Sequence, residues 1–336
     1  MFKKFLCLVV ILLTVVCVMA ACDNPSGETV TTVPTADEET TDQAEETEAI
    51  IQGSDGLQYD LDDSGEGYSV SIGSCTDTEI VIANYYNGKP VISIAAKGFQ
   101  GCTFITNVKI PHTVTVINTR AFLDCPGLTS IVIPDSVTSI GNSAFFNCTG
   151  LTSITIPDSV TSIEMSAFRG CTGLTSITIP DSVTSMSVSV FTHCDNLVSI
   201  TVAEGNPVYH SEGNCVIETA SNILLAGCGS SIIPDYVTSI DGFAFLECSS
   251  LTSIVIPDSV TVICGAAFAE CTNLTSITIP NSVTSIENQV FECTGLTSIT
   301  YEGTVAQWNA ITKGNRWNYE VPATEVICSD GTVSLK

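Results

Sequence analysis

The sequence predicts a β-rich repeat solenoid, with short parallel strands and a cap at each end. Three observations lead to this fold class. The chain repeats with a period of 23 residues, so that Leu128, Leu151 and Leu174 open successive units. Most units carry a Phe followed three residues later by a Cys. Apolar residues recur inside each unit, and one unit of this size cannot bury them alone, so successive units must stack.

The unit at residues 151–173, LTSITIPDSVTSIEMSAFRGCTG, shows how one coil forms. Its LTSITIP segment predicts a short strand in which the Leu and both Ile point inward and the Thr and Ser point outward. Pro157 has no amide hydrogen, so it ends the strand, and Asp158 and Ser159 favour a turn. The later Val, Ile, Ala and Phe return to the interior. About eight inward side chains per coil make the stack self-supporting.

The two flanks differ from the repeat and are expected to close the solenoid. Residues 57–72, LQYDLDDSGEGYSVSI, predict a two-strand hairpin inside an N-terminal cap at 51–87. The repeats themselves occupy residues 88–300, and residues 301–336 are expected to form a C-terminal cap.

One interruption breaks the repeat. Leu197 and Leu251 are separated by 54 residues, which is one unit and 31 further residues. The extra stretch contains CVIE and NILLAGC, which predict an additional strand pair. We interpret residues 203–233 as an elaborated coil within one domain.

The repeat L-x-x-I-x-I-P-x-x-V-x-x-I-x-x-x-A-F-x-x-C, found over residues 88–300, resembles the BspA-like (treponemal-type) leucine-rich repeat family. The resemblance implies a right-handed coil of the leucine-rich-repeat type. It also implies an exported or surface protein, because members are of this kind and some are implicated in adhesion to host proteins and other cells. Enzymatic activity is not typical of the family, and no functional residue is transferred from it.

The first residues have the features of an export signal. Two lysines precede an apolar run at 5–19, and the following Met-Ala-Ala-Cys resembles a bacterial lipobox. Residues 1–21 are therefore expected to be a lipoprotein signal peptide, with Cys22 lipidated and the protein anchored to the outer side of the bacterial cell membrane. The alternative is a plain secretory peptide cleaved near Ala21, which would leave an unanchored product.

The charge balance excludes one class of partner. The chain has 36 acidic residues against 10 Lys and Arg, a formal net charge of −26. It lacks the basic surface that nucleic-acid binding requires. Residues 22–50 contain many Thr and acidic residues but no Lys or Arg, so their composition predicts a disordered tether.

The cysteines are predicted to be free thiols. Neighbouring coils would place equivalent residues about 4.8 Å apart, wider than the roughly 3.5–4.5 Å between the Cβ atoms of a disulfide. No C-x-x-C motif suggests a zinc site, and neither a cofactor nor a metal is expected. The turn aspartates are interpreted as solvent-facing, with cation binding as the alternative. Eight cysteines occupy the same position of the repeat and would form a ladder along the stack: Cys102, Cys125, Cys148, Cys171, Cys194, Cys248, Cys271 and Cys293.

No nucleophile elbow, phosphate loop or dinucleotide motif occurs, so the sequence predicts a non-enzymatic protein. The outward Thr and Ser positions form nearly identical rows, and specific recognition needs distinct anchors. Binding is therefore expected where units depart from the consensus. The candidate binding residues are Tyr85, Tyr86, Lys109, Arg120, Tyr209, His210, Tyr236, Tyr301, Trp308 and Trp317.

The alternative for the aromatic residues near the ends is that they plug the solenoid. The predicted function is binding of an extracellular protein or glycan by a monomer, in adhesion or capture. A structural envelope spacer without a dedicated ligand is the main alternative. An ice-binding surface is a remote third, because T-S-I-T lacks strict alternation.

Overall fold

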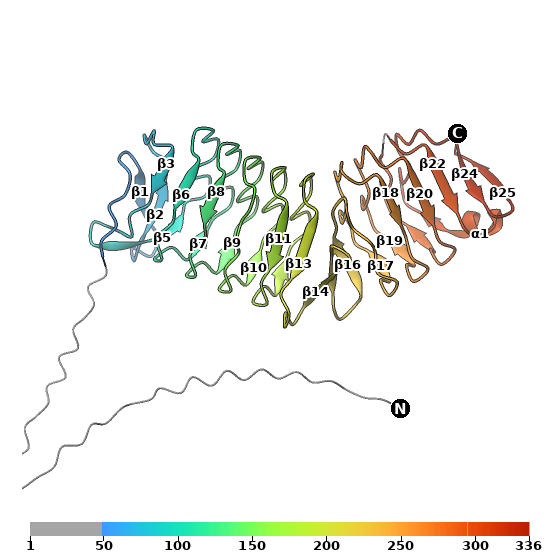
Figure 1. Ribbon diagram of the computed structural model, residues 1–336, viewed down its shortest axis with the longest axis horizontal. Helices are drawn as coiled ribbons and strands as arrows, with labels where there is room; N and C mark the ends of the chain where they lie inside the picture. Colours follow the sequence, from blue (N-terminus) through green and yellow to red (C-terminus); the bar gives the residue numbers. More distant parts are fainter. Residues whose placement is uncertain (1–48, 294, 336) are drawn as a thin grey trace, which may run out of the picture. The chain divides into compact units, whose positions relative to one another are not determined.

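Short parallel strands, stacked coil beside coil in sequence order, build the described part of the chain (Figure 1). The computed structural model describes residues 49–293 and 295–335. The predicted signal peptide, Cys22 and nearly all of the predicted tether lie outside these residues. The described residues form a β-solenoid, as the repeat predicted.

One set of strands comes mainly from the L-x-x-I-x-I segments, whose Ile side chains point into the core. It makes three sheets. The first contains β3 (Glu79–Val81), β6 (Asn107–Lys109) and β8 (Ser130–Val132). The second contains β11 (Ser176–Ile179) and β13 (Ser199–Val202). The third contains β18 (Ser253–Val255), β20 (Ser276–Ile279), β22 (Ser298–Tyr301), β24 (Glu325–Cys328) and β25 (Gly331–Ser334).

A second set comes mainly from the short S-I segments that follow the turn. Successive coils pair in parallel one period apart, as in Ser162 opposite Ser185. The first sheet contains β1 (Gln58–Leu61), β2 (Tyr68–Ser71), β4 (Tyr85–Tyr86), β5 (Lys89–Ile94), β7 (Val116–Ile117), β9 (Ser139–Ile140), β10 (Ser162–Ile163) and β12 (Ser185–Met186). The second contains β14 (Tyr209–Glu212), β15 (Cys215–Glu218), β16 (Ile223–Ala226), β17 (Ser239–Ile240), β19 (Val262–Ile263), β21 (Ser285–Ile286) and β23 (Thr312–Lys313).

One strand prediction is wrong. The segment at 151–157 forms no strand, although its LTSITIP sequence also occurs at 174–180 and 274–280, where it forms β11 and β20. It is joined to the next coil by a long bond from the Thr175 amide to the Thr152 carbonyl (3.4 Å). Because the same sequence forms a strand elsewhere, pairing with the neighbouring coils decides the outcome, not the segment's own propensity.

The Phe and Cys of the repeat link each coil to the next, and we call these two rows of side chains the Phe and Cys ladder. Successive Phe rings stack with centroids between 5.1 and 6.2 Å apart. The Phe122 amide donates to the Ala144 carbonyl (2.8 Å), and the Cys148 thiol donates to the Phe122 carbonyl (3.1 Å). Cysteines in the described residues are free thiols, and Cys264 is the one that is not fully buried. The sequence predicted free thiols packing as small apolar groups, and the structure adds their role as donors.

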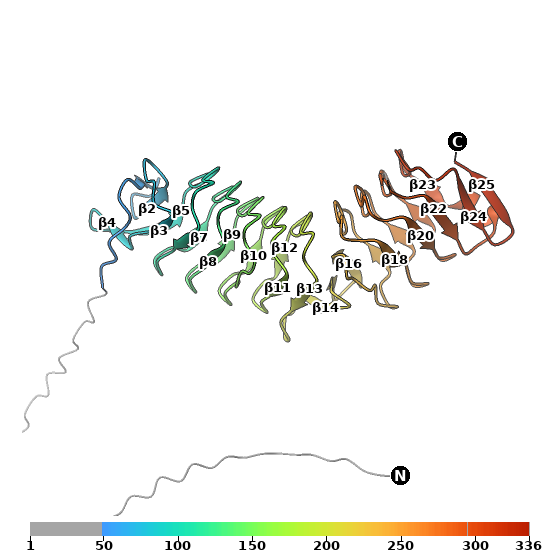
Figure 2. The same ribbon diagram turned by 45° about the horizontal axis from the view of Figure 1, so that its top comes forward.

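The elaborated coil contains three antiparallel strands rather than the predicted pair, because β14 joins β15 and β16. β14 and β16 lie between β13 and β18 (Figure 2). β15 is buried on both faces: Val216 packs into the core of the preceding coils, whereas Cys215 and Ile217 pack into the core of the following ones. The insertion therefore divides the solenoid interior into two apolar clusters.

Both caps close the stack with large side chains. β1 and β2 form the predicted antiparallel hairpin, with Tyr59 opposite Val70. At the other end, Thr304 and Gln307 make a capping box for the single short helix of the described residues, α1 (Val305–Ala310). α1 buries Trp308, and Trp317 meets the ring of Phe291 edge-on (6.3 Å), which ends the Phe stack.

The close approach of Gly227 to Phe245 predicts that a larger residue at position 227 lowers the stability of the protein. Its amide donates to the Ala244 carbonyl (2.9 Å), as ladder Phe amides do to the following coil, and a Cβ there would collide with the ring of Phe245. Gly227→Ala should lower the free energy of unfolding by about 1–3 kcal/mol, because the core must shift. In Gly265→Ala the new Cβ meets nothing closer than 3.4 Å, so stability should stay within about 1 kcal/mol of the parent. Urea unfolding measures both, and equal effects would contradict the prediction.

The buried thiols predict a loss of stability at alkaline pH. Burial raises the pKa of Cys125, Cys194 and Cys215 to about 12. The unfolded chain loses these protons near pH 8.5 while the folded chain keeps them, so the stabilisation is complete below that pH and lost as pH rises towards 12. Urea midpoints should fall steadily between pH 8.5 and 11. Cys194→Ala should show a shallower fall than the parent, and identical slopes would refute the assignment to thiols.

Candidate functional site

The Phe and Cys ladder is interrupted where the insertion separates two coils, between Phe191 and Phe245. In ordinary coils the thiol donates to the Phe carbonyl of the preceding coil, as Cys194 does to Phe168 (3.1 Å). Cys248 instead lies 3.7 Å from the Ser250 hydroxyl. The regular bonding between coils is therefore missing at this junction.

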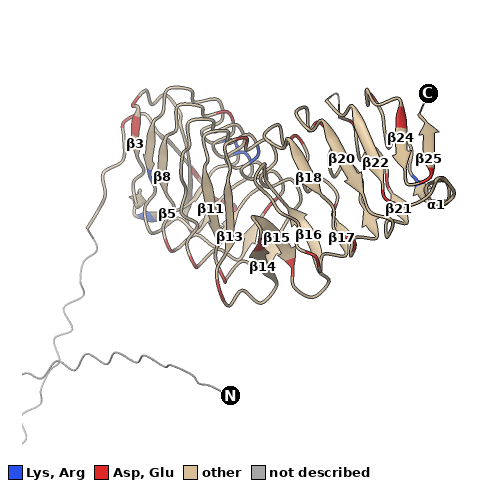
Figure 3. Ribbon diagram, turned by 45° about the vertical axis from the view of Figure 1, so that its right-hand side comes forward, with Lys and Arg blue, Asp and Glu red and all other residues tan. Residues whose placement is uncertain are grey.

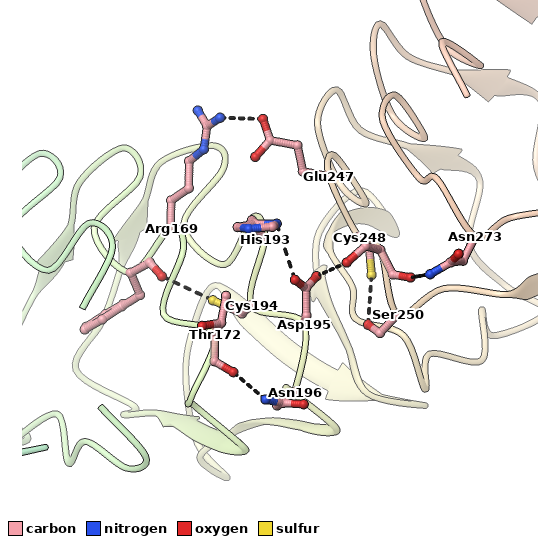
Figure 4. A network of polar contacts seen from close by, with 12 residues as sticks. Arg169, Thr172, His193, Cys194, Asp195, Asn196, Glu247, Cys248, Ser250 and Asn273 are labelled. Carbon is pink, nitrogen blue, oxygen red and sulfur yellow. Dashed lines mark hydrogen bonds and ion pairs between the residues drawn. The ribbon is translucent and has the colours of Figure 1, made fainter. Parts of the chain in front are cut away.

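A polar network crosses the junction in place of the ladder (Figure 4). The Arg169 guanidinium pairs with the carboxylate of Glu247, which lies 78 residues away in sequence. The Ser249 hydroxyl donates to Asp195 (2.5 Å), which also lies 3.4 Å from the ring of His193. Arg169 and Asp195 belong to coils before the insertion, whereas Glu247 and Ser249 belong to the coil after it. These side chains therefore tie the two parts of the solenoid together.

The interior of the junction is too small for a ligand. The cavity between the two parts has a volume of about 20 Å³ and is lined by Phe191, Cys194, Ala226 and Phe245 among others. This volume accommodates about one water molecule. Any binding at the junction must therefore use its outer surface.

That outer surface departs from the hydroxyl-rich rows on the strand side. The outward position before the strand-ending Ile holds Thr in several coils, but Ile232 and Val255 occupy it in the two coils after the interruption. Their exposures are 74% and 77%, and the neighbouring Val198 is 58% exposed. The Ser230 hydroxyl donates to the Val198 carbonyl (2.8 Å), which joins the two coils here. Large exposed apolar side chains in one place indicate an interaction surface.

Polar residues of the insertion lie beside these apolar ones. The Ile232 amide donates to the carbonyl of Gly213 (2.8 Å), the residue after Glu212. The Tyr236 hydroxyl donates to the Glu212 carboxylate (2.9 Å) and lies 2.9 Å from Nε2 of His210. We call Val198, Ile232 and Val255, together with His210, Glu212 and Tyr236, the junction face.

The hydrogen bonds set which atoms donate and which accept between Tyr236, Glu212 and His210. Because the Tyr236 proton is donated to Glu212, Nε2 of His210 must donate to the Tyr236 oxygen. Nδ1 of His210 lies 2.9 Å from the Thr219 hydroxyl, within hydrogen-bond distance. Desolvation, reinforced by the Glu212 carboxylate, raises the pKa of Tyr236 to about 12, so the phenol stays protonated near neutral pH. The group is a rigid, satisfied hydrogen-bond chain.

The structure separates the residues that the sequence singled out. His210 and Tyr236 come together in the junction face. Tyr209, Tyr301 and Trp308 are buried, and the Tyr209 hydroxyl accepts from the Met186 amide (3.1 Å). These three rings are therefore parts of the core and the caps. Four candidates are exposed near the N-terminal cap, and half-buried Trp317 lies in the C-terminal cap. The four are Tyr85, Tyr86, Lys109 and Arg120.

Sequence reasoning missed Val198, Ile232, Val255 and Glu212. A signal for Ile232 and Val255 exists, because they stand one period of 23 residues apart at the outward position. Following that position through the insertion would have found them. Glu212 carries no such signal, since its partner Tyr236 lies 24 residues away in the turn after Pro234.

No group of three His, Cys, Asp or Glu side chains in 49–293 and 295–335 is placed to hold a metal ion. The turn residues Asp135, Asp158 and Asp181 are exposed. Within the same ranges, no helix is long and apolar enough to cross a bilayer.

The charged residues are unevenly distributed (Figure 3). Residues 121–312 hold 17 Asp and Glu but one basic residue, Arg169. Arg169 is already paired with Glu247. The coils that carry the junction face therefore hold exposed acidic side chains without a Lys or Arg partner among the described residues, including Glu204, Asp235 and Asp258.

The fold and its surface define a repeat scaffold of the leucine-rich-repeat class. The model of the BspA type leucine-rich repeat region matches six copies over residues 92–211 and 226–312. The chain belongs to this family. Comparison with curated proteins finds no match.

Solved structures of bacterial proteins share the fold. A leucine-rich repeat protein from Bacteroides ovatus is 27% identical with a TM-score of 0.58, covering 84% of this chain and 71% of that one. The pneumococcal vaccine antigen PcpA is 19% identical with a TM-score of 0.60, covering 84% of this chain and 88% of that one. A leucine-rich repeat protein from Eubacterium ventriosum is 24% identical with a TM-score of 0.51, covering 76% and 73%.

The ion pair across the junction predicts a measurable loss of stability when it is broken. The side chains of Arg169 and Glu247 are 32% and 19% exposed. Glu247→Gln should therefore lower the free energy of unfolding by roughly 1 kcal/mol, and less at high salt. Glu270 occupies the same position one coil later, with φ of 56° against 55°, and forms no ion pair within the described residues. Glu270→Gln should leave stability unchanged, and equal losses in the two variants would count against the proposed tie.

Proposed function

We propose that this protein is a non-enzymatic surface protein that binds a partner protein through the junction face, in adhesion or capture. The observation that carries the proposal is the cluster of Val198, Ile232 and Val255, exposed at 58%, 74% and 77% on a solenoid side otherwise rich in hydroxyl groups. Exposed apolar side chains beside a Tyr and bordered by polar groups have the composition of a binding hot spot.

Membership of the BspA-type family supports export and display at the cell surface. Anchoring rests on the lipobox-like sequence at Cys22, which lies outside the described residues. A lipidated Cys22 would hold the solenoid at the membrane and leave the junction face open to extracellular partners. Labelling with radioactive palmitate, and its loss in Cys22→Ala, tests this anchor.

The acidic surroundings indicate the charge of the partner. Because residues 121–312 contain one base, and that base is paired, a basic protein would gain from long-range attraction. Binding should therefore weaken as salt increases. We expect the protein to act as a monomer, since mutual repulsion opposes close contact between two copies of this surface.

Restoring the consensus residue should abolish binding if the junction face is the site. The double variant Ile232→Thr, Val255→Thr is expected to lose at least tenfold in affinity for basic extracellular proteins presented on an array. Val132→Thr provides a matched control, because Val132 occupies the same repeat position and is 75% exposed, but lies in an ordinary coil. Equal losses in the double variant and the control would show that general surface apolarity, not the junction, drives binding.

A structural spacer is the second candidate, favoured by the uniform hydroxyl rows in the ordinary coils. A spacer would retain no protein specifically on the array. It would also tolerate the double variant without any change in the phenotype of cells displaying it.

A further inference from the structure

A second surface, far along the chain from the junction, has the chemistry of a carbohydrate site. β4 and β5 form a hairpin in the N-terminal cap (Figure 2). A groove of about 330 Å³ is lined by residues of this hairpin and of the segment at 50–57. Its lining combines the rings of Tyr59, Tyr85 and Tyr86 with the polar side chains of Gln52, Asp55 and Asn87. We infer that this groove binds a neutral oligosaccharide.

The aromatic part of the groove is held in place by ring packing. Tyr86 stacks on Tyr59 with centroids 4.4 Å apart and an interplanar angle of 14°, and Tyr68 meets Tyr86 edge-on at 5.1 Å. The Tyr59 hydroxyl accepts from the Ala83 amide (3.4 Å). Tyr85 and Tyr86 are each 39% exposed. Because Tyr59 and Tyr86 are fixed in the free protein, a ligand would not have to order these two rings, which saves binding free energy.

The polar part of the lining is also held in place, by hydrogen bonds of one buried amide and of Ser54. Asn84 is fully buried, and its side-chain oxygen accepts from the Ile51 amide (2.8 Å) while its nitrogen donates to the Ala49 carbonyl (3.1 Å). Ser54 pairs with Val81 through its backbone amide (2.8 Å) and its hydroxyl (3.1 Å). The segment that carries Gln52 and Asp55 is therefore preformed, as expected of a small-ligand site.

The lining selects the ligand class. Tyrosine rings offer apolar faces to the C–H groups of a pyranose ring and a polar edge to its hydroxyls. The carboxylate of Asp55 and the amides of Gln52 and Asn87 accept and donate hydrogen bonds, as sugar hydroxyls require. The groove has one acidic and no basic lining residue, so a sialylated or sulfated glycan would be repelled. A neutral sugar fits this combination.

The test uses the full-length protein on an array of neutral, sialylated and sulfated oligosaccharides, followed by calorimetry with the neutral glycan that binds best. Tyr85→Ala and Asp55→Asn are each expected to weaken that binding at least tenfold. Tyr319→Ala serves as the control, because Tyr319 is 40% exposed but lies in the other cap. The Ile232→Thr, Val255→Thr variant should bind the glycan like the parent, which separates this site from the junction face.

Three outcomes would overturn the inference. The first is that no neutral oligosaccharide binds the parent protein. The second is that acidic glycans bind as well as neutral ones. The third is that Tyr85→Ala and Asp55→Asn, with the circular dichroism spectrum of the parent, bind as tightly as Tyr319→Ala does.

Discussion

The structure depends on one constraint: no coil of 23 residues can bury its own apolar face, so each coil must bond to the next. The ladder of Phe and Cys meets this need. The carbonyl of Phe145 accepts both from the Cys148 amide of its own coil and from the Cys171 thiol of the next, each at 3.2 Å. Stacked rings fill the space between. Apolar packing and hydrogen bonding are satisfied by the same two residue types, which explains their recurrence in the repeat.

The same constraint explains why the insertion needs so many special residues. Where it separates Phe191 from Phe245, the stack loses both ring contact and thiol bonding. The structure compensates in two ways. β15 is apolar on both faces, which lets each part of the solenoid bury its last coil against it. The pairs Arg169 with Glu247 and Asp195 with Ser249 then connect the coils before and after the insertion. A break in the repeat is therefore also where unusual side chains become exposed.

The fold could be predicted from sequence because period, proline and the Phe and Cys positions all report the same coil. The added strand pair was predicted from the short apolar runs in CVIE and NILLAGC, and the starter hairpin from its alternation of apolar and polar residues. β14 was missed because YHSE has no such alternation. The pairing of Tyr236 with Glu212 and of Arg169 with Glu247 could not be predicted, because it depends on how the insertion spaces two coils. The repeat period predicts how ordinary coils stack, but not how side chains are arranged where the repeat is interrupted.

These exceptions suggest how a uniform repeat acquires specificity. In an ordinary coil an exposed apolar residue stands alone: Val132 lies opposite Lys109 of the preceding coil and one period before Thr155. At the junction, Ile232 and Val255 are neighbours, and the insertion supplies a Tyr and a carboxylate beside them. The N-terminal cap does the same with tyrosines that close the end of the stack. In both places, residues needed because the repeat stops also present the chemical variety that recognition requires. The ordinary coils set the distance between these surfaces.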